Sequence, residues 1–298
     1  MEAIVTNALE QGLLYCFMVL GVFITFRVLD FPDLTVDGSL PLGAAVTAAL
    51  ITSGQSPLLA TCVGVAAGLC AGILVGLLHM LLKTGDASNY GPKLLAGILM
   101  MTALYTVNLR VMGRANTPLL GVDTLFDRLG DWLAMDFRSW NLILALLALA
   151  LVIKFLLDWF FHTEVGLCMR ATGDNEQMIR ALGTNTDLTR IMGLALANGL
   201  VALSGSLVAQ QQGFADVGMG IGTIVAGLAS VIIGEAIFGM RSISWVLFSV
   251  IGGSIVYRLL IAVALRIGIA PTDLKLLTAV LVVIALSIPT IRGKMVRA

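Results

Sequence analysis

The feature that most constrains this chain is a series of long apolar stretches that continues from one end to the other. A helix needs about 20 consecutive apolar residues to cross the hydrocarbon core of a bilayer. That length is met near residues 8–27, 57–82, 92–111, 140–160, 190–210, 221–239, 243–265 and 274–290. We therefore expect an all-α, polytopic integral membrane protein.

One further apolar stretch, Pro41 to Ile51, is too short to cross a bilayer as a regular helix. It follows the polar segment Phe31-Pro32-Asp33-Leu34-Thr35-Val36-Asp37-Gly38-Ser39. We interpret it as a short broken second helix whose entry segment is folded into protein. The expected total is then about eight or nine transmembrane helices.

The composition excludes several classes of protein. Hydrophobic residues make up 58% of the chain and charged residues only 12%, about half the charged share of an ordinary soluble domain. The 18 basic and 18 acidic side chains balance, and no basic cluster that could follow a nucleic-acid backbone is visible. We expect a single transmembrane domain over residues 1–298, in contact with membrane lipid and not with nucleic acid.

Lysines and arginines in short loops predict the orientation, because such loops stay preferentially in the cytoplasm. Basic residues lie in the loop between Lys83 and Lys93, in the connection at about 163–190, in the turn at Arg241 and after residue 290. Nine passes place all four on one side. The N-terminus is then outside, the C-terminus is cytoplasmic, and residues 112–139 lie outside.

The external connection at about 112–139 contains an amphipathic pattern. Apolar residues recur at helical spacing, with acidic and basic residues on the other side; the apolar set is Val122, Leu125, Phe126, Leu129, Trp132 and Leu133. Two interpretations remain open. The helix lies on the membrane surface, or it forms part of a platform for an external partner.

The connection at about 163–190 carries unusually dense signals for helix ends. Asp174 or Asn175 can cap a helix, Gln177 stands three residues after Asp174 as in a capping box, and Gly183 can end the helix. We predict a two-turn helix between Gly173 and Gly183 on the cytoplasmic side. Such a helix suits the transmission of force from a soluble partner, although an ordinary connecting loop is the alternative.

Two polar segments enter apolar stretches with the same spacing. Asp37 is followed at +6 and +9 by glycine and valine, and Asp216 is followed by the same residue types at the same offsets. In the expected topology the two segments run in opposite directions, which is typical of an inverted repeat with a transport pathway at its interface. With only three matched positions, coincidence remains an alternative.

Within the expected spans, two small-scale features concern helix packing. Asn198 lies deep in its span, where it either joins helices or lines a pathway. Gly64, Gly68, Gly72 and Gly76 form a stripe at intervals of four residues, which favours close packing between helices of one chain over a dimer interface.

Motifs for catalysis are missing from the sequence. It contains no Gly-x4-Gly-Lys-Ser/Thr phosphate loop, no His-Glu-x-x-His pair and no Gly-x-Ser-x-Gly elbow. We expect no catalytic residue, no metal site and no cofactor in this chain. An intramembrane enzyme is disfavoured for the same reason.

Three stretches carry a resemblance to a known family: residues 30–39, Arg170-Ala171-Thr172-Gly173-Asp174-Asn175, and residues 212–223. Together they resemble the permeases of bacterial ABC importers for tryptophan/tyrosine-type uptake, which are similar to the wider branched-chain amino acid and ribose permeases. The resemblance covers nearly the whole chain. It implies a type II importer fold in the bacterial cytoplasmic (inner) membrane.

The resemblance also implies partners and sites. The partners would be a second permease copy, a dimer of cytoplasmic ABC ATPases that holds ATP and Mg²⁺, and an extracytoplasmic substrate-binding protein. The ATPase-coupling residues would be Gly166, Arg170, Ala171, Gly173, Asp174, Asn175, Met178, Leu182 and Gly183. The translocation route would pass near Asp37, Ser39 and Pro41, and we add Asn198 and Asp216 from their positions in the spans.

The expected function is thus the membrane-spanning subunit of an importer for a small solute. The acidic entry segment Asp30-Phe31-Pro32-Asp33 departs from the branched-chain pattern, which disfavours a branched-chain substrate. The resemblance to the tryptophan/tyrosine-type permeases implies an amino acid of the aromatic type. An ion-coupled secondary transporter of a small polar solute is the alternative, motivated by the inverted repeat.

Overall fold

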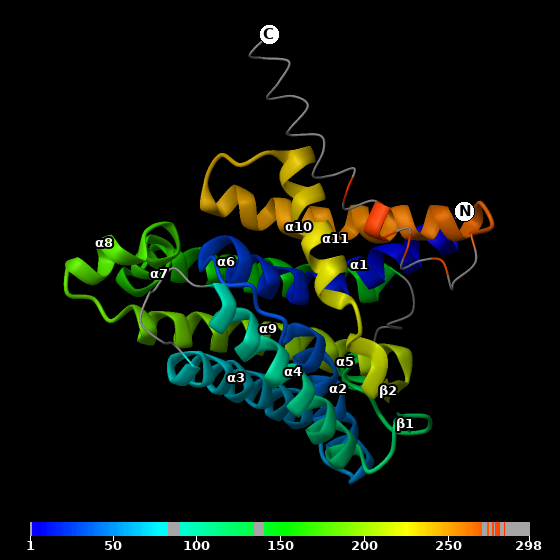
Figure 1. The fold of residues 1–298 in the computed structure, drawn as a ribbon. Helices are drawn as coiled ribbons and strands as arrows, with labels where there is room; N and C mark the ends of the chain where they lie inside the picture. Colours follow the sequence, from blue (N-terminus) through cyan, green and yellow to red (C-terminus); the bar gives the residue numbers. More distant parts are fainter. Residues whose placement is uncertain are drawn as a thin grey trace.

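A computed structural model describes residues 2–82, 90–133 and 140–269, together with Asp273, Leu276, residues 278–280 and Val283. The long helices lie side by side in one bundle (Figure 1). In chain order the elements are α1 (Glu2–Phe23), the π-helical turn η1 (Ile24–Val28), α2 (Val36–Thr52), α3 (Pro57–Leu82), α4 (Tyr90–Met112), β1 (Asn116–Pro118), α5 (Leu125–Leu133), α6 (Trp140–His162), α7 (Glu164–Asp174), α8 (Glu176–Ala181), α9 (Thr186–Gln212), β2 (Phe214–Asp216), the 3-10 turn η2 (Val217–Gly220), α10 (Thr223–Phe238) and α11 (Ile243–Arg266).

Seven helical segments in the described part of the chain are long and apolar enough to cross a membrane, and α2 is a shorter apolar helix. This confirms the expected all-α polytopic fold with a short second helix. The span expected at 274–290 lies mainly outside the described residues. The amphipathic segment expected near 122–133 is helical over α5.

The core of the bundle lies around α1 and α9. In the most apolar stretch of α1, 83% of the residues are buried, and the corresponding share in α9 is 72%. The share in α3, α4, α6, α10 and α11 is 39% or less. Large apolar side chains are exposed along these outer helices, as expected for surfaces that face lipid rather than water.

The glycine stripe of α3 is the contact surface between α3 and α9. A methyl group added at Gly72 would lie 2.2 Å from the carbonyl oxygen of Leu194. One added at Gly68 would lie 2.5 Å from the carbonyl oxygen of Asn198. The two backbones therefore approach as closely as small residues permit, and the stripe is used within the chain as the sequence analysis favoured.

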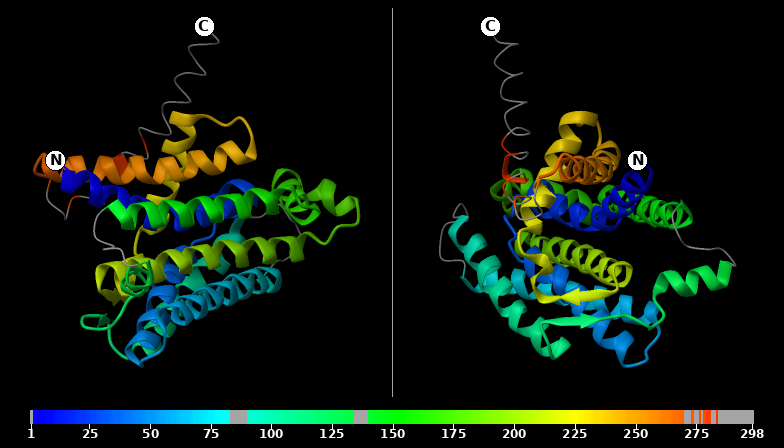
Figure 2. Two further views of the ribbon diagram at one scale, coloured as in Figure 1. Left: turned by 180° about the vertical axis from the view of Figure 1, so that it is seen from behind. Right: turned by 90° about the vertical axis from the view of Figure 1, so that its right-hand side faces the viewer.

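The two ends of the bundle differ. At one end β1 and β2 pair antiparallel, with Asn116 opposite Asp216, and Gln211 donates a hydrogen bond to Glu10 of α1 at 3.3 Å. At the opposite end α7 and α8 project beyond the long helices (Figures 1 and 2). The start of α1 therefore lies at the β1–β2 end, and η1 lies at the α7–α8 end.

The helices α2 and α10 both start inside the bundle. After η1, residues 29–35 turn back into the protein; we call this segment the elbow. From the elbow, α2 runs toward the β1–β2 end. In contrast, α10 starts after η2 and crosses the bundle, and its last turn reaches η1, where Glu235 pairs with Arg27. The entry segment of the broken helix is buried in protein, as the sequence predicts.

Candidate functional site

The starts of α2 and α10 meet in the interior of the bundle. The carboxylate of Asp37 in α2 accepts hydrogen bonds from the backbone amides of Gly222 and Ile224, both at 2.9 Å. It also accepts one from the Thr223 hydroxyl at 3.0 Å. The first amides of a helix lack intrahelical partners and carry partial positive charge, so Asp37 caps α10 although it belongs to another helix.

This junction is tightly packed. A methyl group added at Gly220 would lie 2.0 Å from the carbonyl oxygen of Asp37 and 2.7 Å from the ring of Pro41. Pro41 lies inside α2 and has no N–H, so it cannot donate to the carbonyl of Asp37 in the usual helical pattern. Next to it, Asn108 of α4 donates to the carbonyl of Gly38 at 3.1 Å. The sequence pattern at +6 and +9 therefore marks segments that touch.

A buried polar network ties the elbow to α9. Ser39 donates to the side-chain oxygen of Asn198 at 2.6 Å, and the Asn198 amide donates to the carboxylate of Asp33 at 2.8 Å. Asp33 also accepts from the backbone amide of Thr35 at 2.9 Å. All four residues are fully buried. Asn198 thus joins helices, which was one of its two interpretations.

Asp216 lies apart from this network. Its carboxylate accepts a hydrogen bond from the amide of Gly218 at 2.7 Å and so caps η2. The Asn116 amide lies 3.4 Å from its other oxygen. Of the five residues expected along a pathway, Asp37, Ser39, Pro41 and Asn198 gather near the start of α2, whereas Asp216 belongs to the β1–β2 end.

The connection at 163–190 forms two short helices rather than one. Thr163 caps α7 by accepting from the Gly166 amide at 3.3 Å. Asn175 separates the helices and caps α8, accepting from the Met178 amide at 2.9 Å. Gly183 follows α8 with a φ of +87°, a conformation that favours glycine.

Two details of the predicted two-turn helix are therefore wrong. Gly173 does not break a helix, because it lies inside α7, where it packs against the backbone of η1. The capping box between Asp174 and Gln177 does not form either, because Asp174 is the last residue of α7 and Asn175 takes the capping position. The predictions of Asn175 as a cap and of Gly183 as a terminator are confirmed.

The α7–α8 pair is anchored on one side and exposed on the other. Glu176 accepts hydrogen bonds from Arg190 of α9 at 2.8 Å and from Arg180 at 2.7 Å, which fixes α8 to the start of α9. The expected coupling residues are distributed as follows: Gly166 is buried, Arg170, Ala171 and Gly173 are half-buried, and Asp174, Asn175, Met178, Leu182 and Gly183 are exposed.

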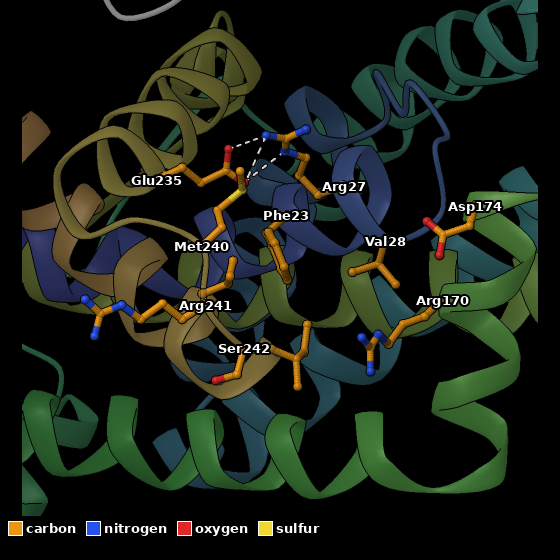
Figure 3. Close-up of a pocket in the computed structure, with 11 residues that line it drawn as sticks. Phe23, Arg27, Val28, Arg170, Asp174, Glu235, Met240, Arg241 and Ser242 are labelled. Atoms are coloured by element: carbon orange, nitrogen blue, oxygen red, sulfur yellow. Dashed lines mark hydrogen bonds and ion pairs between the residues drawn. The ribbon is translucent and has the colours of Figure 1, made fainter. Parts of the chain in front are cut away.

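A cavity of about 340 Å³ opens beside α7 (Figure 3). Its walls come from the end of α1, from α7 and from the turn between α10 and α11. Charged groups of both signs line it: Arg27, Arg170, Asp174, Glu235 and Arg241. The cavity thus lies between α7 and the turn that follows α10.

The comparisons with known proteins fit this architecture. The sequence model described as the permease component of branched-chain amino acid transport systems matches residues 4–287. The chain belongs to this permease family. It is therefore a multi-pass membrane subunit of a transport system rather than an enzyme, and the resemblance expected from its motifs is confirmed.

Individual relatives extend this result. A tyrosine transport system permease protein of Clostridioides difficile is 41% identical over 94% of this chain and 89% of its own length. An uncharacterised protein of Rickettsia prowazekii is 35% identical over 95% of this chain and 97% of its own. An autoinducer 2 import system permease protein of Salmonella paratyphi B is 38% identical over only 28% of this chain and 25% of its own. No solved structure matches significantly.

Sequence reasoning missed several residues of the site. Asp33 was read only as part of an acidic segment, yet it is a partner of Asn198. The ion pair between Arg27 and Glu235 joins residues 208 positions apart, so no local pattern could reveal it. Among the described residues, no three His, Cys, Asp or Glu side chains come together as a metal site.

Proposed function

We propose that this chain is the membrane-spanning subunit of an ATP-driven importer, a single transmembrane unit over residues 1–298. The single observation that carries this proposal is the exposed α7–α8 pair, which projects from one end of the bundle and is anchored to α9 through Glu176 and Arg190. Such a rigid projection can receive force from a separate ATPase. ATP and Mg²⁺ would be held by that ATPase.

In this proposal the α7–α8 end is cytoplasmic, and the β1–β2 end with the N-terminus faces outward across the bacterial inner membrane. The loops with an excess of Lys and Arg support this orientation. A second copy of the permease would complete the pathway. A substrate-binding protein would dock at the outer end, where α5 offers an exposed charged face.

The proposed substrate is an amino acid with an aromatic side chain. The relative that is 41% identical over most of both chains is named as a tyrosine transport system permease, which supports this substrate class. The proposed route passes beside the start of α2 on each copy, near Asp37, Ser39, Pro41 and Asn198. Uptake of labelled tyrosine by the assembled transporter, with competition by leucine, would distinguish an aromatic from a branched-chain substrate.

The coupling assignment is tested by reversing two charges on α7, Arg170→Glu with Asp174→Lys. We expect this pair to weaken ATPase association and ATP-dependent uptake by about tenfold or more, because a complementary charged surface would become repulsive. The matched control reverses two exposed charges near α5, Asp123→Lys with Arg128→Glu, and should leave ATPase association unchanged. Unchanged association in the α7 variant would remove the coupling assignment.

The main alternative is an ion-coupled secondary transporter. The opposed starts of α2 and α10 favour it, because helices that begin in the interior of the bundle are common in such carriers. The two possibilities separate in liposomes. Uptake by the chain alone, driven by an ion gradient without ATP, would support the carrier; uptake only with the ATPase and ATP supports the importer.

A further inference from the structure

An ion pair at the α7–α8 end joins α1 to α10. The Arg27 side chain donates from Nε to Glu235 at 2.9 Å and makes a second contact with the other carboxylate oxygen, so the ion pair is bidentate (Figure 3). The Glu235 side chain is only 8% exposed. Arg27 also lies 3.9 Å from the sulfur of Met240 in the turn that follows α10.

The backbone that carries Arg27 is irregular. Ile24–Val28 form a π-helical turn, and the Leu29 amide bonds back to the carbonyl of Ile24 at 3.0 Å. Such turns are rare and occur often at functional sites. Asp30, two residues later, has a φ of +47°, which is uncommon for a residue other than glycine. Arg27 therefore stands at the entrance to a sharply bent segment.

The proposed coupling segment, α7 and α8, rests on this backbone through α7. A methyl group added at Gly173 of α7 would lie 1.9 Å from the carbonyl oxygen of Val28. Val28 is the neighbour of Arg27, and the elbow follows immediately. A displacement of α7 toward the bundle must therefore displace the backbone that holds Arg27.

The same segment holds both ends of α10. Arg27, just before the elbow, binds Glu235 in the last turn of α10. Asp37, just after the elbow, caps the first turn of α10. The elbow is fixed to α9 between these two points through Asp33 and Asn198. The η1–elbow–α2 segment thus contacts α10 at both of its ends.

There is room for movement at this place. The cavity of about 340 Å³ lies between α7 and the turn after α10, so α7 and the end of α10 are not packed against each other along this line. The Arg27–Glu235 contact is the charged connection across its upper rim in Figure 3.

We propose that Arg27 and Glu235 are positioning residues for transport, which make α10 follow the coupling segment and so transmit its movement to the junction at Asp37. This proposal rests on the function proposed above. The pair acts through α10, and it need not touch the transported molecule. Its loss should therefore leave ATP hydrolysis intact and lower the transport obtained from it.

The test uses the complete transporter, with its ATPase and binding protein, in liposomes. The variants are Arg27→Glu, Glu235→Arg and the double exchange. Each single reversal should lower the amount of substrate transported per ATP hydrolysed about tenfold, and the double exchange should recover at least about half of the wild-type ratio. Arg27→Lys, which keeps the charge but loses the bidentate geometry, should give a ratio of transport to ATP hydrolysis between those of the wild type and the single reversals.

The matched control is Arg258→Glu. Arg258 of α11 also contacts α1, with its guanidinium 3.8 Å from the ring of Tyr15, but at the other end of the bundle. This variant should keep the wild-type ratio. The proposal is overturned if the single reversals keep that ratio, or if the double exchange is no better than the singles although the assembled complex still hydrolyses ATP.

Failure of the proposed function gives a different result. In that case the wild-type chain itself would bind no ATPase or show no ATP-dependent uptake, which would overturn the proposed function and the positioning role together. A folding defect is separated by the quantity of assembled complex and by its ATPase activity. Variants that assemble normally but transport less per ATP support the positioning role.

Discussion

At the scale of single residues, Asp37 joins two helices through its carboxylate. It was expected near a transport route, and the structure gives it three hydrogen-bond donors at the start of α10. Carboxylates at a helix start are favourable because they satisfy free amides and complement the helix dipole. Asp37 therefore has a structural task that is independent of any substrate.

We expect Asp37→Ala to lower the free energy of unfolding by about 1–3 kcal/mol, because the backbone amides of Gly222 and Ile224 lose their acceptor in the protein interior. Asp37→Asn, which keeps one neutral acceptor, should cost less. Thermal unfolding in detergent measures both. The control Asp123→Ala, at an exposed position, should have almost no effect; equal effects at the two positions would contradict the capping role.

At the scale of elements, the contact between α7 and η1 decides how the proposed coupling segment is held. Gly173 is the residue that permits it, since its Cα lies against the carbonyl of Val28. Gly183, by contrast, has open space around it and is required for its positive φ. Two glycines that look alike in the sequence therefore serve different purposes, and only contacts distant in sequence distinguish them.

Gly173→Ala should destabilise the protein by about 1–3 kcal/mol or push α7 away from η1, because backbone atoms cannot yield as a flexible side chain can. The control is Gly91→Ala in the first turn of α4, where a methyl group meets no atom within 4 Å outside the neighbouring residues. Because Pro92 follows, this control carries only the local cost of a side chain before proline, and it should destabilise clearly less than Gly173→Ala. Thermal unfolding and ATPase association report the two effects. If the two alanine variants behave alike, α7 does not rest on η1 as described.

The sequence predicts features that depend on one segment better than contacts between distant segments. Patterns that depend on one segment were predictable: the apolar spans, the glycine stripe of α3, the cap at Asn175 and the amphipathic α5. The partners of Asp33 and of Arg27 were not, because each lies on a helix far away in the sequence. Asp37 lies between these cases. The Gly and Val at +6 and +9 match those after Asp216 and suggested a link between the two segments, but they did not predict that Asp37 caps α10.

At the scale of the whole molecule, the protein is a helical bundle with two different ends and a bent segment between them. The α7–α8 end would receive force, the elbow and α10 would carry it inward, and the junction at Asp37 would respond. This order of transmission requires that α7 and α8 lie in the cytoplasm.

The most direct measurement is thiol labelling from each side of the membrane. The four native cysteines are replaced, and single cysteines are placed at Leu182, which is 73% exposed after α8, and at Leu120, which is 86% exposed near β1. A membrane-impermeant reagent should label Leu182→Cys only in inside-out vesicles and Leu120→Cys only in right-side-out vesicles. Labelling of Leu182→Cys from the outside would contradict the account, because no cytoplasmic ATPase could then reach α7 and α8.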